Sequence, residues 1–344
     1  MSVPTVAAGP HRPVEGTPAR SPGSVRRTTT VDAWRPDGAN GELVLHARGR
    51  DLVTPPPLLR PDRADLPITA AATVVDAIIE PEGRVVRSLR AEPATATLAV
   101  LEGLALGGGF RLALAGGVLE ASVDDNLLVA LLDELPGLGL ISGYDLQRQV
   151  GPEGATDHLD LSAMVDVCAG WAAGTSMALS FAARGKGPWI MGPPAPELGD
   201  PADPLAWHTL PTLSQGTVRR ARRTDVSPPP SPDTTIWQVD VMFRDSYTEG
   251  DGSQTVIHEY AVRATADLST GRLVDIVADP RVLPATECPA AAASAGNLIG
   301  ASLSGLRLQV RRQLRGTHTC THLNDLLRTL ADLPALQALA GASE

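Results

Sequence analysis

Two long stretches of this chain repeat one succession of hydrophobic patterns. Apolar and polar residues first alternate as in strands, and apolar residues then recur at helical spacing. In the first stretch the predicted strands are residues 41–48, 68–79 and 84–90, and the predicted helices are 94–106, 110–119 and 124–135. In the second stretch the predicted strands are 237–244, 255–267 and 272–278, and the predicted helices are 290–299, 303–314 and 321–333. This order predicts an α+β unit in which three helices cover one face of a three-stranded antiparallel sheet.

Short sequence matches between the two stretches predict a tandem duplication. The matches are Val-Arg-Arg at 25–27 and 218–220, Arg-Asp at 50–51 and 244–245, Gly-Arg at 83–84 and 271–272, Pro-Ala at 93–94 and 289–290, and Arg-Leu at 111–112 and 307–308. The same order of matches in both stretches indicates two copies of one unit. We therefore expect a pseudo-two-fold pair.

The matches also set the expected domain boundaries. Residues 1–24 are rich in Pro, Gly, Ser and Arg without periodicity, which predicts a disordered tail. The first repeat then spans 25–146 and the second spans 218–337. Residues 147–217 have no counterpart in either repeat, and their Pro and Gly content predicts an insertion of ordered loops.

Composition and charge narrow the classes of partner. The chain has 344 residues, which agrees with about two domains, and a formal net charge of −10. An acidic protein lacks the broad basic surface that nucleic acids and anionic membranes require, so neither is an expected partner. The basic cluster Arg219, Arg220, Arg222 and Arg223 is short. We interpret it as the solvated start of a strand.

Cysteine usage and hydropathy indicate a cytoplasmic protein. Three cysteines in so long a chain do not form a disulfide framework and suit a reducing compartment. No apolar run approaches the ~20 residues that span a bilayer. The N-terminus has no compact apolar segment of the kind found in secretory signals.

The second repeat alone carries a set of sulfur and nitrogen donors. His258, Cys288, Cys320 and His322 stand where the first repeat has Ala70, Glu92, Asp124 and Asn126. Cys288 precedes a proline, and Cys320 precedes the last predicted helix, so both thiols lie at expected helix starts. The positive end of the helix dipole lowers a thiol pKa, and two thiolates on neighbouring helices are natural metal ligands. We therefore expect a Cys/His site in this half.

Each of these residues also has a plainer interpretation. A free cysteine is commonly inert packing, and a histidine at a helix start commonly forms a hydrogen bond. Three of the four equivalent positions in the first repeat are polar, which favours a functional site at these positions over a place in the hydrophobic core. Cys168, in the insertion, is either a buried small residue or a further ligand or wall of the site. His208 has the same two interpretations.

The segments around the two cysteines resemble a bacterial family of domains of unknown function. They are Phe-Arg-Asp-Ser at 243–246, Glu-Cys-Pro-Ala-Ala at 287–291, and Cys-Thr-His-Leu-Asn-Asp-Leu-Leu at 320–327. Members of that family end in a Gly-Cys-Thr-His-Leu signature, where this chain has Thr319 in place of Gly. The resemblance spans residues 218–337 and implies no established activity.

The order of strands, helix-start cysteines and helices is more distantly similar to the NifU N-terminal type of iron–sulfur scaffold protein. That resemblance implies ligand roles for Cys288 and Cys320, with His318 or His322 in place of a missing histidine. The loop that supplies a further Cys or Asp in those proteins here offers Asp245, Asp251 and His258 but no cysteine. We therefore expect a mixed site for zinc or ferrous iron rather than a cluster.

Three hypotheses of function follow. The leading one is a metalloprotein with one mononuclear site, whose ligands are Cys288, Cys320 and either His322 or His258. Asp245 or Glu259 would support the ligands or act as general base, and an open coordination position would allow hydrolase, hydratase or lyase chemistry on a small organic molecule.

The second hypothesis is a non-catalytic metal or iron–sulfur carrier, or a partner-binding module with a structural ion. The third is a metal-free enzyme in which Cys288 or Cys320 acts with His322. The glycine-rich segments fit no phosphate-binding or dinucleotide pattern, so neither NAD, flavin nor a nucleotide is expected. The sequence is compatible with a homo-oligomer of this chain.

Overall fold

A computed structural model describes residues 6, 8–56, 66–115, 126–150, 162–185, 189–229, 231 and 233–341. Its centre is one antiparallel sheet of eight strands, in the order β4-β3-β2-β1-β5-β6-β7-β8. The strands are β1 (Val25–Trp34), β2 (Leu43–Val53), β3 (Ile68–Ile79), β4 (Val86–Glu92), β5 (Val218–Ser227), β6 (Ile236–Thr248), β7 (Gln254–Asp267) and β8 (Arg272–Val282). The α+β class is confirmed, but the sheet is continuous and each half supplies four strands instead of three.

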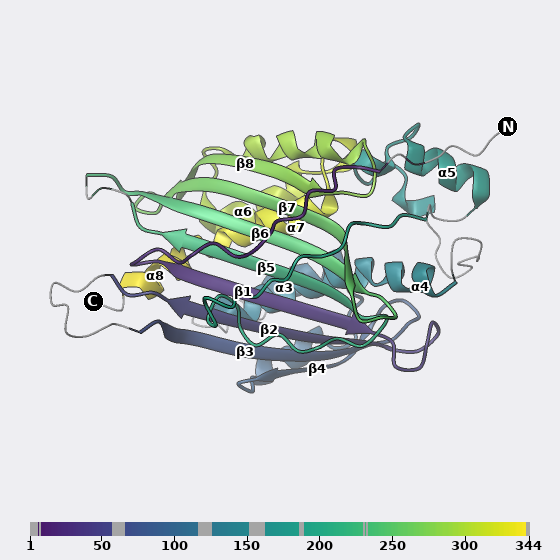
Figure 1. Ribbon diagram of the computed structural model, residues 1–344, viewed down its shortest axis with the longest axis horizontal. Coiled ribbons are helices and arrows are strands. Elements are labelled where there is room, and N and C mark those ends of the chain that lie inside the picture. The colour runs from purple at the N-terminus through teal and green to yellow at the C-terminus, as the bar shows by residue number, and fades with distance from the viewer. Residues whose placement is uncertain are drawn as a thin grey trace.

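Most helices lie on one face of this sheet, behind the strands in Figure 1, whereas α5 lies beyond one end of the strands. The α-helices are α1 (Gly108–Ala113), α3 (Asn126–Ile141), α4 (Gly143–Val150), α5 (Ser176–Arg184), α6 (Leu306–Gln313), α7 (Thr321–Thr329) and α8 (Leu333–Gly341). Short 3-10 helices join them: η1 (Ala96–Leu101), η3 (Ser162–Met164), η4 (Ala169–Trp171), η5 (Cys288–Leu298), η6 (Leu303–Gly305), η7 (Gly316–His318) and η8 (Leu330–Asp332). The expected helix at 290–299 is therefore almost wholly 3-10, and the one expected at 94–106 is 3-10 over Ala96–Leu101 only. Residues 116–125, which include parts of two further expected helices, lie outside the described residues.

The two strands that the patterns missed, β1 and β5, form the middle of the sheet. They pair antiparallel, so that Arg26 lies opposite Asp225 and Asp32 lies opposite Arg219. Both pairs form ion pairs, Arg26 Nε to Asp225 Oδ1 at 2.6 Å and Arg219 Nε to Asp32 Oδ1 at 2.7 Å. The two halves thus exchange matching ion pairs across their junction.

The basic cluster on β5 is buried. Arg219, Arg220, Arg222 and Arg223 are each less than 5% exposed. The expectation of a solvated strand start is therefore wrong. A charged strand can lie inside the protein here because each guanidinium contacts a carboxylate, which offsets the cost of removing it from water.

Two extended segments cover the other face of the sheet, nearer the viewer in Figure 1. The N-terminal segment accepts a hydrogen bond at Val14 O from Arg244 Nη2 at 2.7 Å. The second segment, before β5, accepts one at Pro196 O from Arg244 Nη1 at 2.6 Å. Thr17 Oγ1 donates to Leu198 O, which links the two segments. The described part of residues 1–24 is therefore bound to the sheet and does not form the expected disordered tail.

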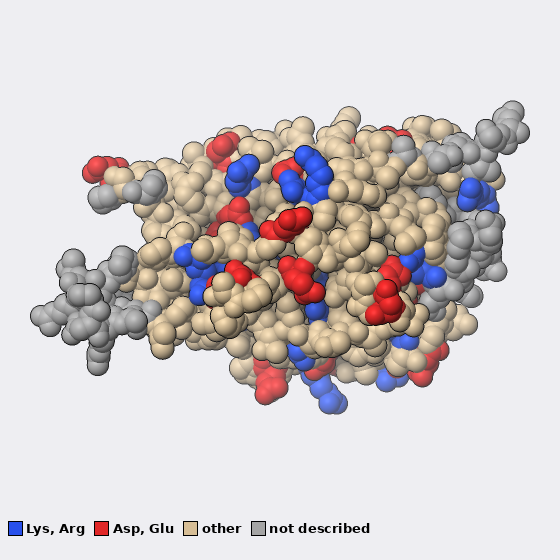
Figure 2. All heavy atoms as spheres, in the orientation of Figure 1, with Lys and Arg blue, Asp and Glu red and all other residues tan. Residues whose placement is uncertain are grey.

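Helix α3 is apolar almost all round and packs against both halves of the sheet. Contrary to the expectation from sequence, the stretch Asn126–Arg148, which spans α3 and most of α4, is long and apolar enough to cross a bilayer, but 83% of its most apolar window is buried inside the protein. This burial is typical of a core helix. On the face shown in Figure 2, acidic and basic side chains are interspersed.

A buried network of charges joins the helices to the sheet. It contains Arg27, Arg111, Arg220, Arg222, Arg307 and Arg328 together with Asp51, Asp133, Glu134, Asp245, Asp325 and Asp332. Six positive and six negative side chains balance one another. Arg220 has a central place, because it contacts Asp245 on β6, Asp325 on α7 and Glu134 on α3. The network therefore fixes α3 and α7 relative to the strands.

Gly137 in α3 leaves the room that this network needs. A Cβ atom there would overlap Arg220 Nη1 and Asp325 Oδ2. We expect Gly137→Ala to lower the free energy of unfolding by about 1–3 kcal/mol, because overpacking would displace a buried ion pair. Urea denaturation measures the change.

Gly109 in α1 provides the matched control, since a Cβ there meets nothing within 4 Å. Gly109→Ala is expected to leave stability unchanged or raise it by up to about 1 kcal/mol through helix propensity. Equal effects of the two substitutions would contradict the packing argument.

Candidate metal centre

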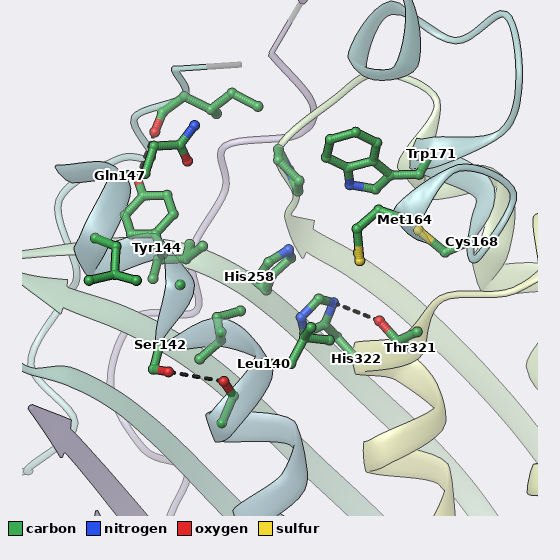
Figure 3. A pocket seen from close by; sticks show the side chains of 18 of the residues that line it. Leu140, Ser142, Tyr144, Gln147, Met164, Cys168, Trp171, His258, Thr321 and His322 are labelled. Atoms are coloured by element: carbon green, nitrogen blue, oxygen red, sulfur yellow. Dashed lines mark hydrogen bonds between the residues drawn. The ribbon is translucent and has the colours of Figure 1, made fainter. Parts of the chain in front are cut away.

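A cavity of about 830 Å³ lies beside one end of the sheet, where β7, the ends of α3 and α7, α4 and the 3-10 segments of the insertion meet. Residues from distant parts of the sequence line it, including Tyr144, Cys168, Trp171, His258, Cys288, Cys320 and His322. Its volume suits a small organic molecule. In Figure 3 the imidazoles of His258 and His322 lie between Tyr144 on one side and Met164, Cys168 and Trp171 on the other.

Two histidines and one aspartate converge at the wall of this cavity. Asp245 on β6 and His258 on β7 are cross-strand partners, so their side chains share one face of the sheet. His322 lies in the first turn of α7 and stacks on His258, with ring centroids 3.7 Å apart and an interplanar angle of 18°. One potential ligand atom from each of Asp245, His258 and His322 lies within 4.8 Å of the other two.

The two imidazoles present nitrogen atoms without hydrogen-bond partners. His258 Nδ1 and His322 Nε2 are buried and unpaired. Asp245 Oδ2 is 3.7 Å from His258 Nδ1, which is beyond hydrogen-bond distance. Because a buried polar atom without a partner costs free energy, these two atoms indicate a site that a further group completes.

Both imidazoles are held in the neutral form. Burial, together with the positive charge of Arg220, lowers the pKa of His322 to about 3. Burial and the neighbouring His322 lower the pKa of His258 well below its ordinary value. Neutral imidazole is the form that binds metal ions.

Asp245 is fully buried and held in place by Arg220. Arg220 Nε lies 2.8 Å from Asp245 Oδ1, and Arg220 Nη2 lies 3.1 Å from Asp245 Oδ2. The ionised carboxylate has about four lone-pair positions, so these two bonds leave capacity for a third partner.

The thiols of Cys288 and Cys320 line the same cavity. Cys320 Sγ is 3.8 Å from His322 Nδ1, and Cys320 precedes α7 at its N-cap position, as expected. Among the described residues, the group with donor atoms mutually within 4.8 Å contains Asp245 and the two histidines but neither thiol. The choice of these cysteines as metal ligands stays a prediction.

The expectation of lowered thiol pKa values is wrong. Burial raises the pKa of Cys288 to about 12, with Cys320 adding to the effect. Burial also raises the pKa of Cys320 to about 11, and Cys168 adds to it. Desolvation of a thiolate in this apolar wall outweighs the stabilisation from a short helix start.

These pKa values predict slow alkylation of Cys288 and Cys320. At pH 8 a thiol with a pKa near 11 or 12 has a thiolate fraction of about 10⁻³ to 10⁻⁴, against about one quarter for an ordinary cysteine. We expect the iodoacetamide rate in chelator-treated protein to rise about tenfold per pH unit between pH 7 and 10. Peptide mapping by mass spectrometry follows each thiol, with urea-unfolded protein as the control. Labelling at pH 7 as fast as in urea would show that the thiols are ionised.

Cys168 and Glu259 lie on opposite sides of the sheet. Cys168 lines the cavity, so it belongs to its wall. Glu259 lies on the opposite face of the sheet from His258, where Arg244 Nε contacts its Oε2 at 2.5 Å. The role of Glu259 as general base or ligand support does not fit this position, because adjacent residues of a strand point to opposite faces.

His208 also lies on that other face, where its ring contacts the hydroxyls of Thr28 and Thr30 at 2.9 Å. Burial lowers its pKa to about 3. His208 therefore stabilises the contact of its segment with β1 and does not join the cavity.

Residues 218–336 match the family model described as "Protein of unknown function (DUF2889)". This match supports a C-terminal domain of unknown function, as the sequence segments indicated. It contains Asp245, His258, Cys288, Cys320 and His322. No curated protein and no solved structure gives a significant match to the chain.

Sequence patterns missed the partner of Asp245. Arg220 was assigned to a solvated cluster, although it holds the carboxylate that faces His258. A signal was present in the sequence match between the two halves, since Arg27 and Asp51 of the first half also form an ion pair, at 2.6 Å. The pairing of Arg with Asp on neighbouring strands, which occurs in both halves, could be recognised only once the strand register was known.

Proposed function

We propose that this chain binds one divalent transition-metal ion through Asp245, His258 and His322, and that the ion acts on a small organic molecule in the adjoining cavity. The observation that carries the proposal is the pair of buried, unpaired nitrogen atoms, His258 Nδ1 and His322 Nε2, next to a carboxylate. Two imidazoles and one carboxylate suit both zinc and ferrous iron.

Arg220 fits this proposal as the residue that orients Asp245. Carboxylates that bind metals are commonly held by a further hydrogen bond, which fixes their direction. The cost of bringing a cation close to Arg220 is reduced because Arg220 also contacts Asp325 at 2.9 Å. His322 would bind the ion with Nε2, while its Nδ1 faces the Thr321 hydroxyl at 3.5 Å and the Cys320 thiol.

Three protein ligands leave coordination positions open for water or substrate. An ion held in this way would polarise a carbonyl group of the bound molecule or activate a water molecule at neutral pH. Hydrolysis, hydration or elimination on a small molecule are the reaction classes that this arrangement favours. The open positions and the cavity favour an enzyme over a metal carrier.

The metal-free alternative is less well supported. A nucleophilic Cys320 requires a thiolate or a nearby base, but burial keeps the thiol protonated, with its pKa raised to about 11. His322, at 3.8 Å, is a weak base because its pKa is lowered to about 3.

Elemental analysis of protein purified under anaerobic, reducing conditions tests the proposal. We expect about one equivalent of zinc or iron per chain, removable by a chelator and restored by adding the same metal. Protein that contains neither metal and binds neither Zn²⁺ nor Fe²⁺ on titration would overturn the proposal.

We also infer that the two halves arose by tandem duplication. The support is the reciprocal pairing of β1 with β5 and the equivalent ion pairs Arg27–Asp51 and Arg220–Asp245. The strand order is mirrored about the β1–β5 junction, with four strands on each side. Under this inference the first half keeps the scaffold of the ion pair while the second half adds His258 and His322.

A further inference from the structure

Sulfur atoms gather on one side of the imidazole pair. We call this the sulfur end of the cavity, defined by Met164, Cys168, Met177, Cys288 and Cys320. Met164 and Cys168 lie together with Trp171 on that side in Figure 3, and Cys288 Sγ packs against Gly170. The insertion therefore supplies half of a binding wall, and η5 and α7 supply the rest.

The opposite side of the imidazole pair is more polar. Ser142, Tyr144 and Gln147 lie there in Figure 3. Arg35, which also lines the cavity, donates through Nη1 to Ser142 O at 3.1 Å and lies 3.5 Å from Asp145. The cavity therefore changes from a polar side, through the imidazoles, to a sulfur-lined side.

The sulfur end offers few hydrogen-bond partners. Met177, Cys288 and Cys320 are buried and pack in one apolar cluster. Thiols and thioethers are weak hydrogen-bond partners. A charged or strongly polar ligand group would lose its hydration there without compensation.

Aromatic rings are the groups that such a wall favours. Sulfur atoms about 5 Å from a ring make favourable contacts with it beyond simple burial. Trp171 adds an aromatic side chain, held edge-on to Phe181 with ring centroids 6.1 Å apart. A cavity of about 830 Å³ also has room for a ring system with a polar substituent.

We propose that the sulfur end binds the aromatic ring of an aryl-containing small molecule, whose polar substituent lies toward the imidazoles. That this molecule is a substrate rests on the proposed function, but binding of the ring does not require a metal. The proposal names the substrate class of the site and assigns the insertion its part in selecting it.

Methionine methyl NMR tests the proposal on the whole protein. The probes are 2-naphthol and its saturated analogue decahydro-2-naphthol, added to chelator-treated and metal-loaded protein labelled with ¹³C-methyl methionine. We expect 2-naphthol to shift the methyl signals of Met164 and Met177 in both forms, because the ring current of a bound ring acts on methyl groups that lie against it. Met242 is the internal control, since it is buried on the other face of the sheet against Ala221.

A variant that lacks the Met164 sulfur atom provides a second test. Met164→Leu keeps the apolar volume and is expected to weaken 2-naphthol binding about two- to tenfold while leaving the saturated analogue unaffected. Equal affinity for the two probes, or no shift at Met164 and Met177 up to saturation, would overturn the aryl proposal. Ring binding without any metal binding would leave it standing and remove the proposed metal function, whereas metal binding without ring binding would do the reverse.

Discussion

Replacing His322 with alanine is expected to lower the affinity for zinc or ferrous iron by more than about a hundredfold. Loss of a residue that merely orients a ligand already costs 10- to 100-fold, and His322 is proposed to bind the ion directly. The substitution removes one of two partly buried imidazoles and leaves His258 without its stacking partner at 3.7 Å. Titration of chelator-treated protein with Zn²⁺ measures the change.

His11→Ala is the matched control for this prediction. His11 lines the same cavity but does not belong to the group formed by Asp245 and the two histidines. Its replacement is expected to leave metal affinity within about threefold of the parent protein, since no ligand is lost. If both variants bind metal as the parent does, His322 is not a ligand.

The thiols need their own variants in the same titration. Cys288→Ala and Cys320→Ala are expected to keep one metal equivalent, because neither sulfur belongs to the group of mutually close donor atoms. Loss of the metal in both variants would instead favour the Cys-based site indicated by the sequence.

Replacing Arg220 with methionine is expected to lower the free energy of unfolding by about 3–5 kcal/mol, because breaking a buried ion pair leaves uncompensated charge. Arg220 is 1% exposed and contacts Asp245, Asp325 and Glu134. Burial by itself would lower the pKa of Arg220. The neighbouring carboxylates, of which Asp245 has the largest effect, outweigh burial, so the net pKa is raised. Urea denaturation measures the effect.

Two companion variants define the origin of that loss. Arg220→Lys keeps a charge but lacks the planar fork that spans both oxygens of Asp245, so an intermediate loss is expected. Arg272→Met alters an exposed arginine that donates to Gly300 O, and a change within about 0.5 kcal/mol is expected. A loss below about 1 kcal/mol for Arg220→Met would contradict the proposed role of the buried network.

Strands with a clear alternation of apolar and polar residues were predictable from sequence. Residues 68–79 are β3, and 255–267 agree with β7 to within one residue. The strands β1 and β5 were missed because charged or hydroxyl side chains occupy both of their faces. Such a pattern normally indicates a segment exposed to solvent. These two strands can be buried because their charged side chains form ion pairs in the folded protein.

The residues that meet at the candidate site were named from the sequence, but their grouping was not predicted. Comparison of the two expected repeats singled out His258 and His322, whose rings stack between β7 and α7. Helix-start arguments could not predict the protonation of Cys288 and Cys320, because desolvation depends on the surrounding wall. Glu259 was expected to act with His258 because the two are adjacent in sequence. Its side chain points to the other face of the sheet, where it contacts Arg244.

Anomalous X-ray scattering from crystals of the metal-loaded protein tests the central claim most directly. The account predicts one strong peak at the zinc or iron edge, about 2.0–2.2 Å from nitrogen atoms of His258 and His322 and an oxygen of Asp245. A peak bonded instead to the sulfurs of Cys288 and Cys320, or no peak at the imidazole pair, would contradict it.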